Sequence, residues 1–238
     1  MIKVCFISSV INLDQVVINL LRKEMIRLAE IDTHLEFWFF GCRDEFSQKA
    51  VQFIQELRAI LPENKIDIVA VVDPIRNEWL EMSDYNERVD GFPSGAVTRL
   101  EYSCIDLEKT QLDPHRFVEH YRKVSRRYME QCDLILALHY DNLPHPVNTE
   151  VKRLRKKKKP EVVSIYNHAL HQQIEACIMD MEGREGDVLR KLREGSTYRE
   201  ISIEYEVTIN RIQQIANKAV RKVMKATWDK ELDVDVKN

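Results

Sequence analysis

The stretch that organises this sequence runs from Asp187 to Ala226: DVLRKLREGSTYREISIEYEVTINRIQQIANKAVRKVMKA. Its apolar residues recur at helical spacing, which predicts two short helices, a tight turn and a longer helix. Ser196 or Thr197 can cap the second helix, because a hydroxyl oxygen accepts the free backbone N–H groups of a first turn. Glu200, three residues after Thr197, completes the pattern of a capping box.

The last predicted helix begins after a break at Val207 and Thr208, and the Thr208 hydroxyl can cap it. Its apolar stripe has a period of 3.6 residues and consists of Ile209, Ile212, Ile215, Ala216, Ala219, Val220 and Val223. Amide and basic side chains lie between them; amides and Arg can bind base edges, while Lys and Arg bind phosphates. The candidate DNA-binding residues are Thr208, Asn210, Arg211, Gln213, Gln214, Lys218, Arg221, Lys222 and Lys225.

This segment resembles the helix-turn-helix of bacterial sigma factor region four and of related response-regulator modules. The matching residues are Arg199-Glu200-Ile201, Val207-Thr208, Arg211-Ile212, Gln214-Ile215 and the tail Lys218-Ala219…Arg221-Lys222-Val223. The family usually has Gly before the Val-Thr pair, where this chain has Glu206. A left-handed backbone there would cost Glu about 1 kcal/mol relative to Gly. The alternative interpretation is a plain helical hairpin used for dimerisation.

Charge is distributed unevenly along the 238 residues. The whole chain has a net charge of −3, whereas residues 187–226 contain nine Lys or Arg and five Asp or Glu. This stretch is therefore net +4 and the remainder net −7. An acidic body with a basic appendage is typical of a DNA-binding module attached to another domain.

Cysteine usage and hydropathy indicate the cellular compartment in which the protein is expected. The five cysteines are odd in number and widely spaced, which predicts reduced thiols. We find no signal peptide and no apolar run near the roughly 20 residues of a membrane span. We therefore expect a cytoplasmic protein with no membrane contact.

Strands and helices alternate upstream of the opening stretch. Apolar runs predict five strands, at residues 2–7, 35–40, 66–72, 134–138 and 162–166. This alternation predicts an α/β, Rossmann-like parallel sheet covered by helices. We expect that domain over residues 1–168, a small all-α helix-turn-helix domain over 169–228, and a polar tail at 229–238. Residues 73–114 show no long periodicity, as in a lid or binding loop.

Several blocks of the N-terminal part occur in a characteristic order. They are Phe37 to Gly41 with Arg43 and Phe46, Ala50…Glu56-Leu57, Ile68 to Val72, Arg126-Arg127-Tyr128-Met129…Cys132 to Ala137, and Thr149-Glu150-Val151…Lys157-Lys158-Lys159…Val163-Ser164-Ile165. In this order, residues 1–167 resemble the SLOG superfamily, specifically its YpsA-like branch. The resemblance implies a Rossmann-like domain that binds a nucleotide or a nucleotide-derived ligand.

The family places glycines after the first, second and fourth strands, where bare backbone N–H groups approach a phosphate. This chain has Ser8-Ser9, a single Gly41 and a glycine-free loop before Thr149. The candidate ligand-binding residues are Ser8, Ser9, Gly41, Arg43, Arg126, Arg127, Asp133 and Thr149. The lost glycines argue against an enzyme and leave a retained ligand pocket or a scaffold for protein contacts. No spacing matches a zinc module, so no metal is expected.

These observations predict a DNA-binding transcriptional regulator whose N-terminal domain senses a nucleotide-like ligand or mediates assembly. A single helix-turn-helix buries little surface on double-stranded DNA, so a homodimer or higher oligomer is expected. Two alternatives remain. One is a SLOG-type nucleotide-processing enzyme with a helical oligomerisation tail. The other is an adaptor that docks on RNA polymerase, although no candidate for the other sigma regions is present.

Overall fold

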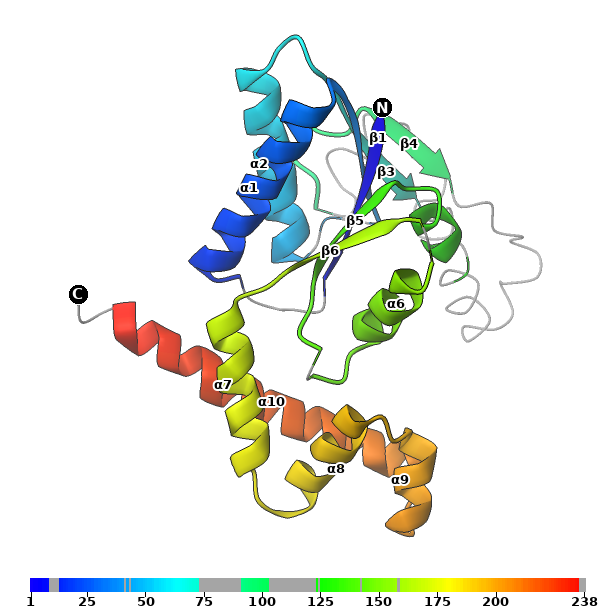
Figure 1. Ribbon diagram of the computed structural model, residues 1–238, viewed down its shortest axis with the longest axis vertical. Coiled ribbons are helices and arrows are strands. Elements are labelled where there is room, and N and C mark those ends of the chain that lie inside the picture. The colour runs from blue at the N-terminus through cyan, green and yellow to red at the C-terminus, as the bar shows by residue number, and fades with distance from the viewer. Residues whose placement is uncertain are drawn as a thin grey trace. The chain divides into compact units, whose positions relative to one another are not determined.

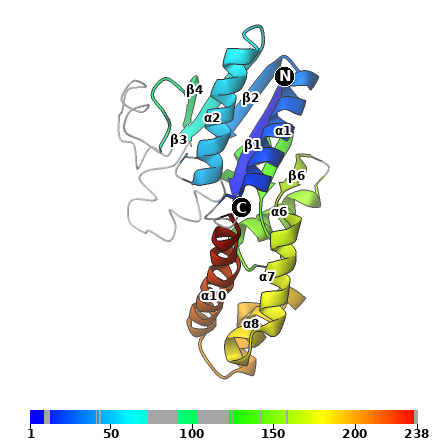
Figure 2. The same ribbon diagram turned by 90° about the vertical axis from the view of Figure 1, so that its left-hand side faces the viewer.

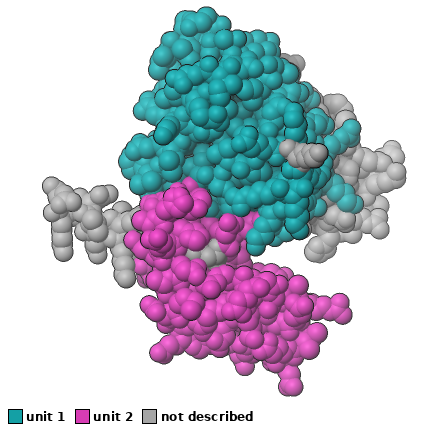
Figure 3. Space-filling view, in the orientation of Figure 1, with its two compact units in different colours: residues 1–139, 149–165 teal, residues 140–148, 166–238 magenta. Residues whose placement is uncertain are grey.

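The computed structural model describes residues 1–8, 13–40, 42, 44–72, 91–102, 123, 125–141, 143–157 and 159–235 (Figure 1). The chain forms two compact units (Figure 3). The sheet unit comprises residues 1–139 and 149–165, and the helical unit comprises residues 140–148 and 166–238. Within the described ranges, no helix is both long and apolar enough to cross a membrane.

The sheet unit is built on a six-stranded sheet with the order β4-β3-β2-β1-β5-β6. Its strands are β1 (Ile2–Ser8), β2 (His34–Phe39), β3 (Lys65–Val72), β4 (Arg99–Tyr102), β5 (Leu134–Leu138) and β6 (Glu161–Ile165). Every neighbouring pair is parallel, which confirms the predicted fold class. The predicted number of strands was wrong, because the four residues of β4, RLEY, contain two charges and no apolar run.

Helices cover both faces of this sheet. Figures 1 and 2 show α1 (Gln15–Ile31) and α2 (Glu45–Ile60) on one face and α6 (Pro146–Arg155) on the other. The Asp14 side chain caps α1 by accepting the Val17 N–H. The helix α6 begins before Thr149, within the glycine-free loop expected there. Pro146 begins this helix, since proline lacks only an N–H that a first turn leaves unused.

The face of the sheet under α1 and α2 is apolar and aromatic. Side chains alternate along a strand, so Phe37 and Phe39 of β2 share one face. Phe6 of β1 stacks on Phe39 with ring centroids 4.7 Å apart, and Phe46 of α2 meets Phe6 edge-on at 6.1 Å. These buried rings hold α2 against the centre of the sheet.

The helical unit contains α7 (His168–Asp180), α8 (Gly183–Glu194), α9 (Tyr198–Glu204) and α10 (Ile209–Asp235), which confirms a helical C-terminal region. The last of these packs against the other three. The buried core cluster consists of Val188, Ile201, Ile212, Ile215 and Ala216. Each fully buried Ile or Val stabilises the fold by about 1.5–3 kcal/mol relative to exposure.

The ends of α9 match their sequence signals. The Thr197 hydroxyl accepts the Glu200 N–H at 3.2 Å, and the Glu200 carboxylate accepts the Thr197 N–H at 2.7 Å, which confirms the capping box. At the other end, the Val207 N–H donates to the Ser202 carbonyl at 3.0 Å. This Schellman motif requires a left-handed residue, and Glu206 fills that position with φ 53°.

The junction between α7 and α8 depends on a close backbone approach. A Cβ atom on Gly186 would lie 2.0 Å from the Met181 carbonyl oxygen. The Arg190 guanidinium of α8 donates to the carbonyls of Ile178 and Met181 at 3.1 and 2.9 Å. Because the last carbonyls of a helix lack partners within it, this arginine satisfies the end of α7.

Candidate nucleic-acid interface

The exposed face of α10 has a uniform chemical character. Residues 209–227 contain no Asp or Glu. Opposite the buried stripe lie Asn210, Gln214, Asn217 and Arg221, all exposed. Their spacing of four, three and four residues places them on one side of the helix over about 16 Å. This side therefore offers hydrogen-bond donors and positive charge without an opposing carboxylate of its own.

The first turn of α10 is ordered by its own polar side chains. The Thr208 hydroxyl accepts the Arg211 N–H at 3.2 Å, so the predicted cap is confirmed. The Arg211 guanidinium donates to the Gln214 side-chain oxygen at 3.2 Å. Gln213 is exposed at the edge of this face. The residue types that bind base edges bidentately are thus present at the start of the helix.

Two of the predicted phosphate-binding lysines already have a partner. Glu185 of α8 lies 2.9 Å from the Lys218 Nζ and also pairs with Lys222. Hydrogen bonds from Lys218 and Lys222 hold the pKa of the Glu185 carboxyl below its usual range. Because a carboxylate competes with phosphate for the same cations, these lysines are less available than their exposure suggests.

Arg221 and Lys225 of α10 form no ion pair with any described side chain, and neither does Arg199 in the first turn of α9. By contrast, Lys191 of α8 is paired with Glu204 at 2.6 Å. Sequence reasoning did not propose Arg199 as a contact. Its exposed cationic side chain, within the matched block Arg199-Glu200-Ile201, was the available signal.

In the sheet unit, two of the predicted ligand-binding residues lie at opposite edges. Ser8 pairs in register with Leu138 at the carboxyl edge, between β1 and β5, where the strand order reverses. Ligands of such sheets bind at this switch point. Asp133 lies at the amino edge, where its carboxylate accepts the Lys3 N–H at 3.0 Å. Lys3 and Ser8 are five residues apart, about 17 Å along a strand, so Asp133 does not join Ser8 in one small pocket.

The predicted arginines lie elsewhere in the same unit. Arg126 donates to the Glu150 carboxylate at 3.0 Å, next to Thr149, which is exposed on α6. Arg127 is exposed. Ser9, Gly41 and Arg43 lie outside the described residues. The structure thus brings Arg126 close to the helix that carries Thr149 and separates Asp133 from Ser8.

One further cluster has the residue types of a metal site. Ligand atoms of His34, Glu36 and Asp67 lie within 4.8 Å of one another. However, Arg99 donates to both Glu36 carboxylate oxygens at 3.1 and 3.3 Å, and the Lys3 Nζ lies 3.9 Å away. These cations already neutralise the carboxylate, so the cluster is suited to ion pairing across β1, β2 and β4 and not to a metal.

A comparison of the sequence with models of protein families found no match, and neither did a search among curated proteins. The structural class of the chain therefore follows from its fold alone, which is a parallel six-stranded α/β sheet followed by an all-α region of four helices.

Proposed function

We propose that this chain is a DNA-binding transcriptional regulator that contacts double-stranded DNA through α10. One observation carries this proposal: the exposed face of α10 presents amides and unpaired cations, with no acidic residue from 209 to 227. A polyanion such as DNA binds favourably to such a face, because a nearby cation attracts each phosphate and a carboxylate would repel it. The resemblance of residues 199–223 to sigma factor region four supports the same function.

The residues of α10 divide between two roles. Asn210 and Gln214 can form bidentate hydrogen bonds to adenine, and Arg211 can do the same to guanine. Arg221 and Lys225, further along the helix, supply phosphate contacts that set orientation. In this arrangement the N-terminal turns of α10 enter the major groove, as the second helix of a helix-turn-helix does.

The sheet unit supplies the regulatory input in this proposal. Its likeness to the SLOG superfamily supports a nucleotide-like ligand above the switch point between β1 and β5, where Ser8 ends β1. Binding there would change assembly or DNA affinity. Alternatively, the same sheet acts only as a scaffold for oligomers.

A second candidate is an adaptor that docks on RNA polymerase. Ile203 of α9 has 69% of its surface exposed, and Ile209 at the start of α10 is also exposed. Large aliphatic side chains beside a turn favour a protein partner. Capture of purified polymerase by the full chain, and its loss in the Ile203→Glu protein, would support this candidate.

The DNA proposal is tested by fluorescence anisotropy with genomic DNA fragments at several salt concentrations. We expect the parent protein to bind with an affinity that falls by a log–log slope of about 0.9 per phosphate contact. The Arg211→Ala, Arg221→Ala double variant should lose about 100-fold in affinity. Arg193→Ala serves as the control, because Arg193 pairs with Glu175 of α7. A parent without salt-dependent binding contradicts the proposal.

A further inference from the structure

Exposed aliphatic side chains gather on α1 and α2 of the sheet unit. They are Val16, Leu20, Ile26, Ile31 and Ile60. Ile26 exposes 42% of its surface and Ile60 exposes 68%. Single exposed apolar residues are ordinary, but Ile26 and Ile60 line the same groove, and neighbouring exposed apolar residues mark an interaction surface.

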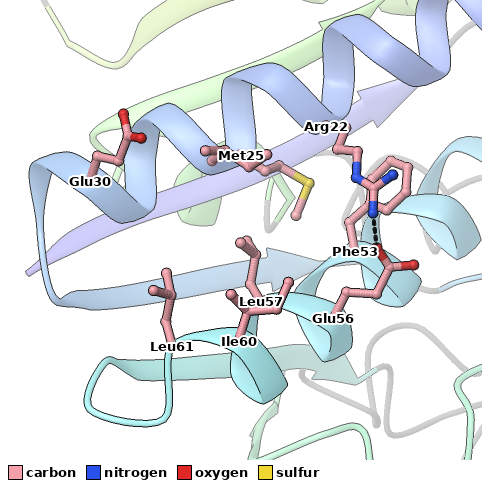
Figure 4. A pocket seen from close by; sticks show the side chains of 9 residues that line it. Arg22, Met25, Glu30, Phe53, Glu56, Leu57, Ile60 and Leu61 are labelled. Carbon is pink, nitrogen blue, oxygen red and sulfur yellow. Dashed lines mark hydrogen bonds and ion pairs between the residues drawn. The ribbon is translucent and has the colours of Figure 1, made fainter.

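A groove of about 360 Å³ runs between these two helices (Figure 4). Its floor is apolar, with Met25, Phe53 and Leu57 among the lining residues. Arg22 closes one end with an ion pair to Glu56 at 2.6 Å. Figure 4 shows Glu30 on α1 near the other end. The surface is therefore an apolar strip with an ion pair at one end and the Glu30 carboxylate near the other.

The charges beside Ile26 have a definite order. Lys23 lies three residues before Ile26 and Glu30 lies four residues after it, so all three share the outer side of α1. Lys23 and Glu30 are exposed, and neither forms an ion pair with a side chain in the described ranges. A basic group on the N-terminal side and an acidic group on the C-terminal side complement the same helix running antiparallel.

We propose that this surface binds a second copy of the chain, with the two α1 helices antiparallel across a two-fold axis at Ile26. Lys23 of each protomer then faces Glu30 of its partner, and the two Ile26 side chains meet at the axis. Such an isologous contact requires a self-complementary patch, which this order of charges provides. A partner of a single charge sign would leave Lys23 or Glu30 opposed by a like charge.

The size of the surface predicts a weak dimer. A standard interface buries about 800 Å² on each partner. The proposed surface is centred on the single helix α1, which has 17 residues and is about 25 Å long, so it is smaller than a standard interface. We expect a dissociation constant in the micromolar range. The dimer would be independent of DNA, and it would supply the paired helix-turn-helix modules that two half-sites require.

The first test is sedimentation equilibrium of the full chain over a range of concentrations without DNA. The parent should show a monomer–dimer equilibrium, and Ile26→Glu should raise its dissociation constant at least about 10-fold, because burying an unpaired carboxylate is costly. Ile203→Glu is the matched control and should change nothing. If the parent stays monomeric, the proposal that a second copy binds this surface is wrong, and the groove would bind a different protein. An unchanged dimer in Ile26→Glu overturns the proposed surface.

A charge exchange tests the antiparallel alignment. Lys23→Glu and Glu30→Lys should each weaken the dimer by several-fold, because each places like charges opposite one another. The double variant should restore parental affinity. Circular dichroism of each variant verifies that the fold is retained, and exposed positions make that the expected result. A double variant that is no better than the single variants overturns the antiparallel pairing.

Discussion

The helices α1 and α10 are held in their units in the same way, but their exposed sides carry different chemical groups. Each buries an apolar stripe, and each begins with a side-chain oxygen that accepts a backbone N–H, from Asp14 and Thr208 respectively. The outer side of α1 carries aliphatic groups and charges of both signs. From residue 210 to 225, the outer side of α10 carries amides and cations and no carboxylate. The buried stripe thus fixes each helix in its unit, while the exposed side determines which partner it suits.

The largest expected difference between the two helices comes from adding a negative charge to each outer side in turn. Asn217→Asp on α10 should weaken DNA binding by about 10-fold or more, because a carboxylate on this face repels phosphate. Asn19→Asp makes the same change on exposed α1 and should leave DNA affinity unaltered. Anisotropy on one DNA fragment measures both. Equal losses in the two variants would show that the two helices do not differ in partner.

The support of the two helices also differs. The sheet holds α1, whereas α10 depends on α8, whose placement requires Gly186. Gly186→Ala should destabilise the helical unit by about 1–3 kcal/mol, because its Cβ would overlap the Met181 carbonyl. Thermal unfolding followed at 222 nm measures this change. An unaltered melting temperature would mean that the α7–α8 junction yields without cost.

Glu185 modulates the charge of α10 from outside the helix. Glu185→Gln should tighten DNA binding a few-fold and steepen the salt slope by up to about 1.8, since Lys218 and Lys222 would both be released to phosphates. Glu175→Gln is the matched control, because Glu175 of α7 pairs with Arg193 of α8. Unchanged affinity in Glu185→Gln would indicate that these lysines do not reach DNA.

This ion pair has a defined pH dependence. The folded-state pKa of Glu185 is lowered by its lysine partners. The stability that its ion pairs contribute is therefore complete above the unfolded-state pKa of about 4.3, and it is lost as the pH falls through the folded-state pKa. The difference between the parent and Glu185→Gln should therefore persist between about pH 5 and pH 7. Titration of both proteins against the same DNA at these two pH values measures it.

The smallest expected effect concerns the turn that leads into α10. Both α8 and α9 end with a left-handed residue, Gly195 with φ 104° and Glu206 with φ 53°. Glu206→Gly should stabilise the helical unit by up to about 1 kcal/mol, and Gly195→Ala should destabilise it by a similar amount. Urea unfolding compares the two. A destabilised Glu206→Gly protein would show that the Glu206 side chain contributes more than the backbone strain costs.

The sequence by itself determined what depends on neighbours along the chain. Buried apolar runs predicted the parallel sheet, and the caps at Thr197 and Thr208 were recognisable because a cap spans only three or four residues. The same local reasoning missed β4, whose charged residues pair with β3 only in the assembled sheet. It also named the polar residues of α10, whose role in DNA binding stays a prediction.

Only the tertiary structure decided which of the candidate residues are already engaged. Glu185 and Lys218 are 33 residues apart in sequence, yet packing of α8 against α10 places their charged atoms 2.9 Å apart. Likewise, strand register sets Asp133 beside Lys3 and away from Ser8. Electrostatic and hydrogen-bond partners depend on distances through space, which a single sequence does not contain. The pattern of residues therefore predicts a chemical type for a surface, and the fold decides which of its groups are available.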